Sequence, residues 1–389
     1  MQLKLPRPGT LALAAVLLLL MAGVGAVMMP RLRVLKFERD VLRLGGTTRV
    51  ASSAPVWLAR QALDLGCEAI LTVFETRVTT VALTGADVDD GWVARLAQRP
   101  EIEHLDLSHT RITDSALMGL GSLGRLGTLD LSATDLHGPG LAALRRCSRL
   151  QALDLYGCPV SGEALENLAD ATLLRTLDLT RTEITGGSLR HIAKCTAMDN
   201  LCLEGTRIED DDLADLKSMT KISILCLMDT PITDEGIAHL KDLPGLTFLD
   251  LRGTKLTDAG LPSLVELKHL TNLPLARTAV TDRGIAVLKQ IPTLQMLDLS
   301  STAVTDECLE HLSELPGLAI LGLARTQISD RGIEILKTWK KDRVRLFVAD
   351  TPTSASARSE LAIAHPQWVI DTRQAPEWTL DAEIVLPQR

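Results

Sequence analysis

The feature that most constrains the fold of this chain is a Leu-x-Leu motif that returns every 24 residues. The motif begins at Leu105, Leu129, Leu153, Leu177, Leu201, Leu225, Leu249, Leu273, Leu297 and Leu321. Val81-Ala82-Leu83 extends the series upstream, and Leu346-Phe347-Val348 extends it downstream after a slip of one residue. A constant period of this length indicates stacked copies of one structural unit, because a single unit cannot bury its apolar face alone.

Each unit combines a strand pattern with a helix pattern. The alternating leucines predict a short strand, because successive strand side chains point to opposite faces. Leucine pairs spaced by three, such as Leu117 and Leu120, lie on one face of a helix. Thr-Asp or Ser-Asp pairs, such as Thr233-Asp234, stand between the two and are typical helix N-caps. Each unit is therefore predicted to form a short strand, a turn and a short returning helix.

Over about 81–351, roughly twelve units, these columns resemble the leucine-rich-repeat family. The form Leu-Asp-Leu-Ser-x-Thr-x-Ile-Thr-Asp is similar to that of a bacterial subgroup that is often membrane-anchored. It is also similar to the cysteine-containing repeats of ubiquitin-ligase substrate receptors. The resemblance implies an α/β solenoid, a curved horseshoe with parallel strands on its concave face and short helices on its convex face.

One column departs from the commonest family pattern. Five residues after the first Leu, that pattern has Asn, whose amide bridges adjacent turns. Here the column reads Thr110, Thr134, Cys158, Thr182, Thr206, Thr230, Thr254, Thr278, Thr302 and Thr326. Because a threonine hydroxyl both donates and accepts, we expect a ladder of hydroxyl groups between units in place of the Asn ladder.

The N-terminus predicts a membrane segment. Residues 9–30 carry no charge and are nearly all aliphatic. The segment has the length that a helix needs to cross a bilayer, about 20 residues. We expect a signal-anchor helix at 9–30 behind a basic segment at 1–8; cleavage near Val24-Gly25-Ala26 is the alternative. Two basic residues precede the segment and five follow it, but a long domain can be translocated regardless, so the side of the membrane stays open.

The remaining chain divides by composition and by the need to seal both ends of a solenoid. We expect a juxtamembrane linker at 31–56, an N-terminal cap at 57–80, the repeats at 81–351, and a C-terminal cap and tail at 352–389. A helix is expected at 55–69 in the first cap. In the second cap we expect a helix at 355–364 and a half-unit at 366–370.

The concave columns contain the candidate partner-binding residues. One residue after the first Leu, four aspartates stand on consecutive strands about 4.8 Å apart. Farther along, the same face becomes apolar, and Tyr156 and Arg252 are of types common in binding hot spots. The candidate residues are Asp106, Asp130, Asp154, Tyr156, Asp178, Ile224, Met228, Phe248, Arg252 and Met296. Solvated aspartates and scattered surface hydrophobes are the competing interpretation.

Composition and motifs exclude several other functions. A net charge of −8 and only ten aromatic residues (4 Phe, 5 Trp, 1 Tyr) argue against nucleic-acid binding. The stretch Gly119–Gly124 matches a dinucleotide pattern, but its leucines fall on core positions of a returning helix. The seven cysteines have no CxxC spacing; Cys202 and Cys226 should be neighbours, and a bridge between them is left open.

We therefore predict no catalytic residue, no cofactor and no metal site. The predicted function is that of a membrane-tethered, non-enzymatic scaffold that binds a protein partner on the concave face. The alternatives are a substrate-recognition subunit of a ubiquitin-ligase-like complex and, with least support, a carboxylate hydrolase or cation-binding surface at the aspartate row. The partner's identity and the oligomeric state stay open.

Overall fold

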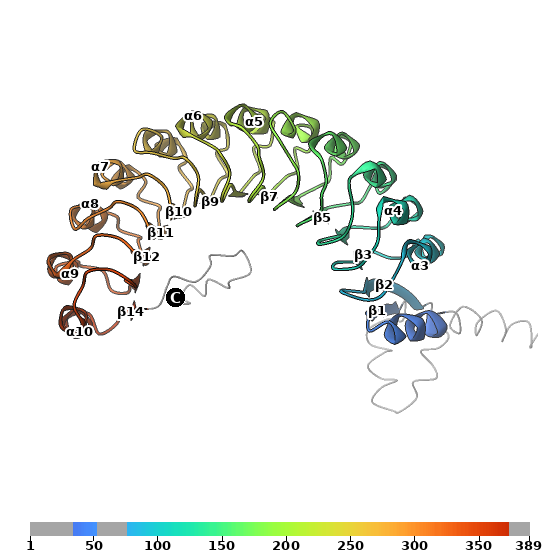
Figure 1. Cartoon of the computed structure of the whole chain (residues 1–389), viewed down its shortest axis with the longest axis horizontal. Coiled ribbons are helices and arrows are strands. Elements are labelled where there is room, and N and C mark those ends of the chain that lie inside the picture. Colours follow the sequence, from blue (N-terminus) through green and yellow to red (C-terminus); the bar gives the residue numbers. More distant parts are fainter. Residues whose placement is uncertain (1–33, 53–75, 373–389) are drawn as a thin grey trace, which may run out of the picture.

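The computed structural model describes residues 34–52 and 76–372, which form one curved 14-stranded sheet (Figure 1). The strands follow one another in chain order from β1 (Thr47–Ser52) and β2 (Thr76–Ala82) to β14 (Val369–Asp371). The pairs from β2 onward are parallel, whereas β1 is antiparallel to β2. The strands line the inside of the arc and the helices its outside, which confirms the predicted solenoid.

The strands of the repeats are short and equivalent. They are β3 (His104–Asp106), β4 (Thr128–Asp130), β5 (Ala152–Asp154), β6 (Thr176–Asp178), β7 (Asn200–Cys202), β8 (Ile224–Cys226), β9 (Phe248–Asp250), β10 (Asn272–Pro274), β11 (Met296–Asp298), β12 (Ile320–Gly322) and β13 (Arg345–Phe347). Paired strands align the first leucine of one motif with that of the next, as Leu105 pairs with Leu129. Residues 24 apart therefore stack in columns across the sheet.

Each returning segment is an α-helix, a 3-10 helix, or an α-helix followed by a 3-10 turn. They are α3 (Asp90–Val93), η2 (Ala94–Gln98), α4 (Asp114–Leu120), η3 (Pro139–Arg146), η4 (Gly162–Leu168), η5 (Leu189–Ile192), α5 (Asp210–Asp215), η6 (Leu216–Ser218), α6 (Asp234–Ile237), η7 (Ala238–Asp242), η8 (Leu261–Glu266), α7 (Asp282–Ile285), η9 (Leu288–Gln290), α8 (Cys308–Ser313) and α9 (Asp330–Lys337). The predicted N-cap bonds form at Thr113, Thr233 and Ser329, whose side chains each accept a bond from a first-turn N–H, whereas the Thr281 side chain makes no such bond to α7.

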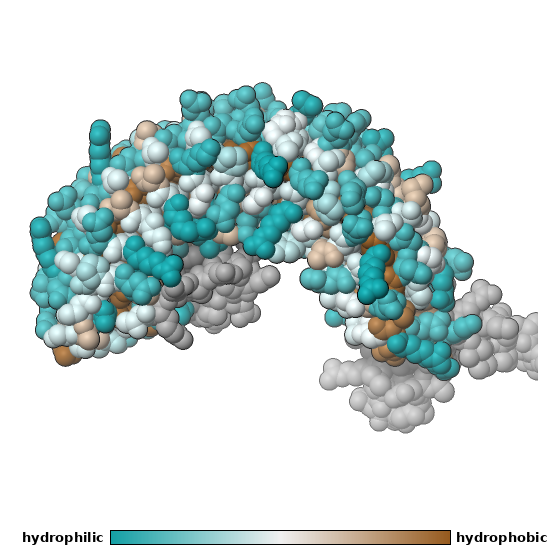
Figure 2. Space-filling view, in the orientation of Figure 1, coloured by the Kyte–Doolittle hydropathy of each residue, from teal (hydrophilic) through white to brown (hydrophobic). Residues whose placement is uncertain are grey.

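The core is one continuous aliphatic layer between the strands and the helices. Both leucines of each motif are buried, and so are the helix leucines that face them, such as Leu117 and Leu120. Each buried leucine contributes about 1.5–3 kcal/mol through the hydrophobic effect. Hydrophilic side chains cover most of the flank seen in Figure 2, with narrow hydrophobic strips between them.

The N-terminal cap differs from the prediction. Residues 34–43 are helical, and their Val34, Phe37 and Val41 are buried in the main core, while β1 extends the sheet. The stretch 34–52 is therefore part of the cap and not a juxtamembrane linker, because its apolar residues recur at helical spacing and pack on the first unit. The helix expected at 55–69 lies outside the described residues.

The C-terminal end is sealed by aromatic side chains. Helix α10 (Ala355–Ala364) forms where the sequence predicts it, and β14 continues the sheet beside β13. The indole Nε1 of Trp368 donates to the Lys341 carbonyl at 2.9 Å, and the His365 ring stacks on Trp368 at a centroid distance of 4.2 Å. Trp339 packs edge-on against Trp368, so these rings cover the last layer of the core.

The predicted membrane segment at 9–30 lies outside the described residues. Within residues 34–52 and 76–372, no helix combines the length and the hydropathy that a bilayer crossing requires.

Candidate partner-binding face

Asp106, Asp130, Asp154 and Asp178 form a continuous row on the concave side, here named the acidic row. They are consecutive register partners on β3, β4, β5 and β6, and all four are half-buried. Each carboxylate accepts a bond from the backbone N–H two residues later, as from Tyr156 to Asp154 at 2.8 Å. These bonds fix the carboxylates in one orientation across four units.

The position of each carboxylate within the row affects its protonation. Burial raises the pKa of Asp154 to about 6; the Tyr156 N–H opposes this, and the charges of Asp178, Asp130 and Asp106 add to it. Burial also raises the pKa of Asp178 above its usual value. The row therefore concentrates negative charge that a cationic group on a partner would neutralise.

Tyr156 stands at the edge of the acidic row and is held by Arg181. The Arg181 Nη1 donates to the Tyr156 hydroxyl at 3.0 Å, and its guanidinium carbon lies 5.7 Å from the centre of the tyrosine ring. Arg181 also approaches Glu204 at 3.8 Å. The sequence interpretation did not include Arg181, because it occupies a turn column whose residue type varies from unit to unit.

Arg252 is bound within its own unit. Its Nε donates to Asp250 Oδ1 at 3.0 Å and its Nη2 donates to Asp250 Oδ2 at 2.5 Å, and its side chain is only 10% exposed. Burial disfavours the charged guanidinium, but the bonds to Asp250 outweigh it and raise the pKa of Arg252. Arg252 thus lies on the predicted face, but its charge is already matched by Asp250.

The apolar part of the face is less exposed than the sequence suggested. Ile224, Met228 and Phe248 are half-buried, as a contact surface requires. Met296 is only 1% exposed, because it packs against Phe347 from β13, with Phe248 and Ile320 beside them. Phe347 was not among the predicted residues, although its place in the last Leu-x-Leu motif was visible in the sequence.

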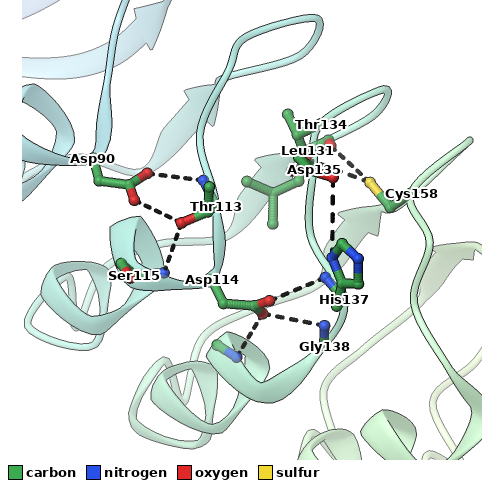
Figure 3. A network of polar contacts seen from close by, with 11 residues as sticks. Asp90, Thr113, Asp114, Ser115, Leu131, Thr134, Asp135, His137, Gly138 and Cys158 are labelled. Carbon is green, nitrogen blue, oxygen red and sulfur yellow. Dashed lines mark hydrogen bonds and ion pairs between the residues drawn. The ribbon is translucent and has the colours of Figure 1, made fainter.

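A second column of aspartates, here named the flank ladder, connects neighbouring units. The sequence pattern did not predict these connections. Asp234 shows the pattern: its Oδ1 accepts from the Thr257 N–H at 2.8 Å and its Oδ2 from the Thr257 hydroxyl at 2.6 Å. The same two bonds link Asp90 to Thr113, Asp210 to Thr233, Asp258 to Thr281, Asp282 to Thr305 and Asp306 to Ser329. Figure 3 shows the first of these links.

The predicted ladder of threonine hydroxyls between units is wrong, and the flank ladder links the units instead. The threonines of the expected column donate to the carbonyl three residues earlier in their own unit, as Thr110 does to Leu107 at 2.6 Å. At one position the column does reach the next unit, because the Thr134 hydroxyl lies 3.4 Å from the Cys158 sulfur (Figure 3). Cys158 in that column does cross over, because its thiol donates to the Leu131 carbonyl at 3.0 Å.

Three consecutive units lack the flank aspartate. Gly138, Gly162 and Gly186 occupy that position, and the returning segments η3, η4 and η5 of these units are 3-10 helices. In the first of them the Asp114 carboxylate instead accepts from the backbone N–H groups of His137, Gly138 and Gly140 (Figure 3). An aspartate in the first turn favours an α-helix, but it does not decide the helix type alone, because the unit that carries Asp258 also returns through a 3-10 helix, η8.

The other residues considered for a site are part of the buried core. Leu120 and Leu123 of the GxGxxG-like stretch, and Leu117 just before it, are buried in the main core, as predicted. Burial raises the pKa of both Cys147 and Cys195 to about 11, so these thiols act as small apolar residues. Within the part of the chain that the structure describes, no group of three or more His, Cys, Asp or Glu side chains is placed to hold a metal ion.

Comparisons with known proteins agree with this geometry. A family model described as Leucine Rich repeat matches residues 102–121 and 244–265. No curated protein matches the sequence. The structure resembles an internalin (inlF) from Listeria monocytogenes, with 22% identity and a TM-score of 0.59 over 82% of this chain and 96% of that one. It also resembles a chain of the mouse RP105/MD-1 complex, with 20% identity and a TM-score of 0.54 over 71% of this chain and 48% of that one.

At these identities the two structural likenesses show the fold alone. The family model and the stacking of the strands in columns agree with this fold. The chain therefore contains leucine-rich repeats and has the leucine-rich-repeat solenoid fold.

Proposed function

We propose that this chain is a non-enzymatic scaffold that binds a protein partner on its concave face. The observation that carries the proposal is that one uninterrupted sheet surface presents two chemically different zones. The acidic row lies on β3 to β6. The half-buried Ile224 and Phe248 lie on β8 and β9, and Met228 lies two residues after β8. A surface that offers charge at one end and apolar area at the other suits a folded or extended polypeptide.

The charge of the face indicates the kind of partner. Burial, and to a smaller extent the neighbouring carboxylates, raise the pKa of Asp154 and Asp178, so negative charge at these two positions is disfavoured. A basic segment of a partner would relieve that repulsion, so we expect Lys or Arg opposite the acidic row. The similar mouse protein was solved in complex with MD-1, which supports a protein-binding role by analogy of fold.

Site-specific photocrosslinking tests the proposal. A benzophenone amino acid replaces Tyr156 or Phe248 on the concave face, and Met118, which is 72% exposed on helix α4, serves as the control. The proposal predicts that both concave positions crosslink the same cellular protein and that the Met118 position does not. Equal crosslinking from Met118, or crosslinks confined to it, would contradict the proposal.

Membrane tethering through residues 9–30 is part of the same proposal. The support is the uncharged apolar stretch in the sequence and its length. The full chain should stay with membranes during alkaline carbonate extraction, whereas a chain that lacks residues 1–30 should be released. Reporter fusions after residue 60 then decide on which side of the membrane the repeats lie. Release of the full chain by carbonate would count against a tether.

A further inference from the structure

Cys202 and Cys226 face each other at the centre of the concave side. They are register partners on β7 and β8, in the same column as the acidic row. Paired strands lie about 4.8 Å apart, which falls within the Cα separations that disulfides span. Both cysteines carry free thiols in the structure.

The other described cysteines lack such a neighbour. Cys147, Cys158, Cys195 and Cys308 belong to the main core, whereas Cys202 and Cys226 lie outside it and are 7% and 8% exposed. Cys147 and Cys195 share a column but stand two units apart, about 10 Å at the usual strand spacing. Among the cysteines that the structure describes, the pair on β7 and β8 thus combines strand register with a position outside the main core.

We infer that Cys202 and Cys226 form an oxidation site, at which a hydroperoxide converts the two thiols into a reversible disulfide. One sulfur attacks the peroxide oxygen, breaks the O–O bond and becomes a sulfenic acid. The other sulfur then attacks the sulfenic sulfur, forms the S–S bond and releases water. Two S–H bonds are broken, two electrons pass to the peroxide, and hydrogen peroxide is reduced to two molecules of water. The inference does not depend on the proposed binding function.

The surroundings of the pair set the rate of this reaction. The hydrogen bond with Cys226 and burial raise the pKa of the Cys202 thiol well above its usual value. The charged groups that face the pair are Asp178 and Asp250 in the same column, with Glu204 and Arg252 in the next column. Because the thiolate is the nucleophile, oxidation is slow at neutral pH and accelerates as the pH rises.

The test is disulfide mapping of the full-length chain in a Cys67→Ser background, since Cys67 lies outside the described residues. The folded protein is treated with hydrogen peroxide at about pH 8, where thiolates become more abundant. The remaining thiols are alkylated and the chain is cut with trypsin. The expected product joins peptide 195–207 to peptide 222–241. Because Cys195 shares the first peptide with Cys202, a matched Cys195→Ala sample assigns the linkage.

The inference predicts that the linked peptide forms in the Cys195→Ala chain, disappears in Cys202→Ser, and is reversed by dithiothreitol. It also predicts about tenfold less of this linkage when the same protein is oxidised in urea, because only the folded sheet holds the register. Linkages spread equally among all the cysteines, or peroxide treatment that leaves Cys202 and Cys226 unlinked in the folded chain, would overturn it. The urea comparison uses the unsubstituted pair, so it is decisive even where a variant fails to fold.

Discussion

Two columns of aspartates run along this molecule with the same 24-residue period, and their surroundings are opposite. In the flank ladder, each carboxylate meets an N–H and a hydroxyl of the next unit, as Asp234 meets Thr257. In the acidic row, each carboxylate meets another carboxylate on the next strand, as Asp130 meets Asp154. The same side chain at the same spacing therefore links neighbouring units on one side of the solenoid, whereas on the other side burial and neighbouring carboxylates disfavour the charge of Asp154 and Asp178.

The two columns of aspartates also differ in which units of the chain carry them. The units of β4, β5 and β6 carry glycine at the flank position and aspartate in the acidic row. The units from β7 to β12 carry the flank aspartate, and most of their concave positions are not acidic. The three units without a flank aspartate are therefore also three of the four units that form the acidic row.

The largest effect should come from breaking the flank ladder. Asp234→Ala removes the acceptor of both Thr257 bonds, and hydrogen bonds to charged groups contribute about 1.5–3 kcal/mol each. We expect a loss of about 3 kcal/mol in the free energy of unfolding by urea, with faster hydrogen exchange at the Thr257 amide. Glu235→Ala, an exposed change in the same helix, is the control and should be nearly neutral.

A smaller loss should follow from crowding the flank ladder. A Cβ on Gly284 would lie 2.3 Å from the Asp258 Oδ1, so Gly284→Ala should cost about 2 kcal/mol of unfolding free energy. The cost should shrink in an Asp258→Ala background, because the obstructing oxygen is then absent. Gly124→Ala, where a Cβ meets nothing within 4 Å, is the matched control. An equal cost in both backgrounds would show that the carboxylate is not the obstacle.

Removing a negative charge from the acidic row should raise the free energy of unfolding, whereas the changes in the flank ladder lower it. The pKa of Asp154 is about 6 in the folded protein and 3.8 in its unperturbed form, so the folded state holds this proton more tightly. Stability should fall as the pH rises from about 4 to about 6, and Asp154→Asn should flatten that decline. Since the side chain is partly solvated, the gain at neutral pH should be about 1 kcal/mol. Thermal unfolding across this pH range provides the measurement.

The smallest effect should come from the serine donors of the acidic row. The Ser132 hydroxyl donates to Asp130 Oδ1 at 2.7 Å, but the Ser132 backbone N–H donates to the same oxygen at 2.9 Å. Ser132→Ala should therefore cost only about 0.5 kcal/mol in urea unfolding, because the oriented carboxylate keeps one bond. A loss as large as that of Asp234→Ala would mean that the acidic row is a structural element like the flank ladder.

Much of the fold was predictable because the period alone determines the strand register. The N-caps at Thr113, Thr233 and Ser329 followed from local pairs, and α10 from local composition. The flank ladder was not predictable in the same way. Asp234 appeared only as a capping residue, since a local pattern does not show that its carboxylate reaches the following unit.

The sequence pattern predicted which columns of residues form the candidate face, but not how exposed each side chain is. Alternation along each strand predicted that Phe248 and Met296 face away from the main core, and in the structure they belong to a separate cluster. Burial depends on neighbours from other units, so the packing of Phe347 against Met296 could not be derived from alternation. For the same reason the cap at 34–52 was misassigned, because its contacts are with residues distant in the sequence.

The central comparison is tested most directly by making one substitution in both columns. Asp258→Asn and Asp154→Asn are both nearly isosteric, and urea unfolding at neutral pH measures both against the unsubstituted chain. The flank variant can no longer accept from the Thr281 hydroxyl at Oδ2, so its free energy of unfolding should fall by about 1–2 kcal/mol. The acidic-row variant should rise by about 1 kcal/mol. Changes of the same sign in both variants would contradict the assignment of opposite roles to the two columns.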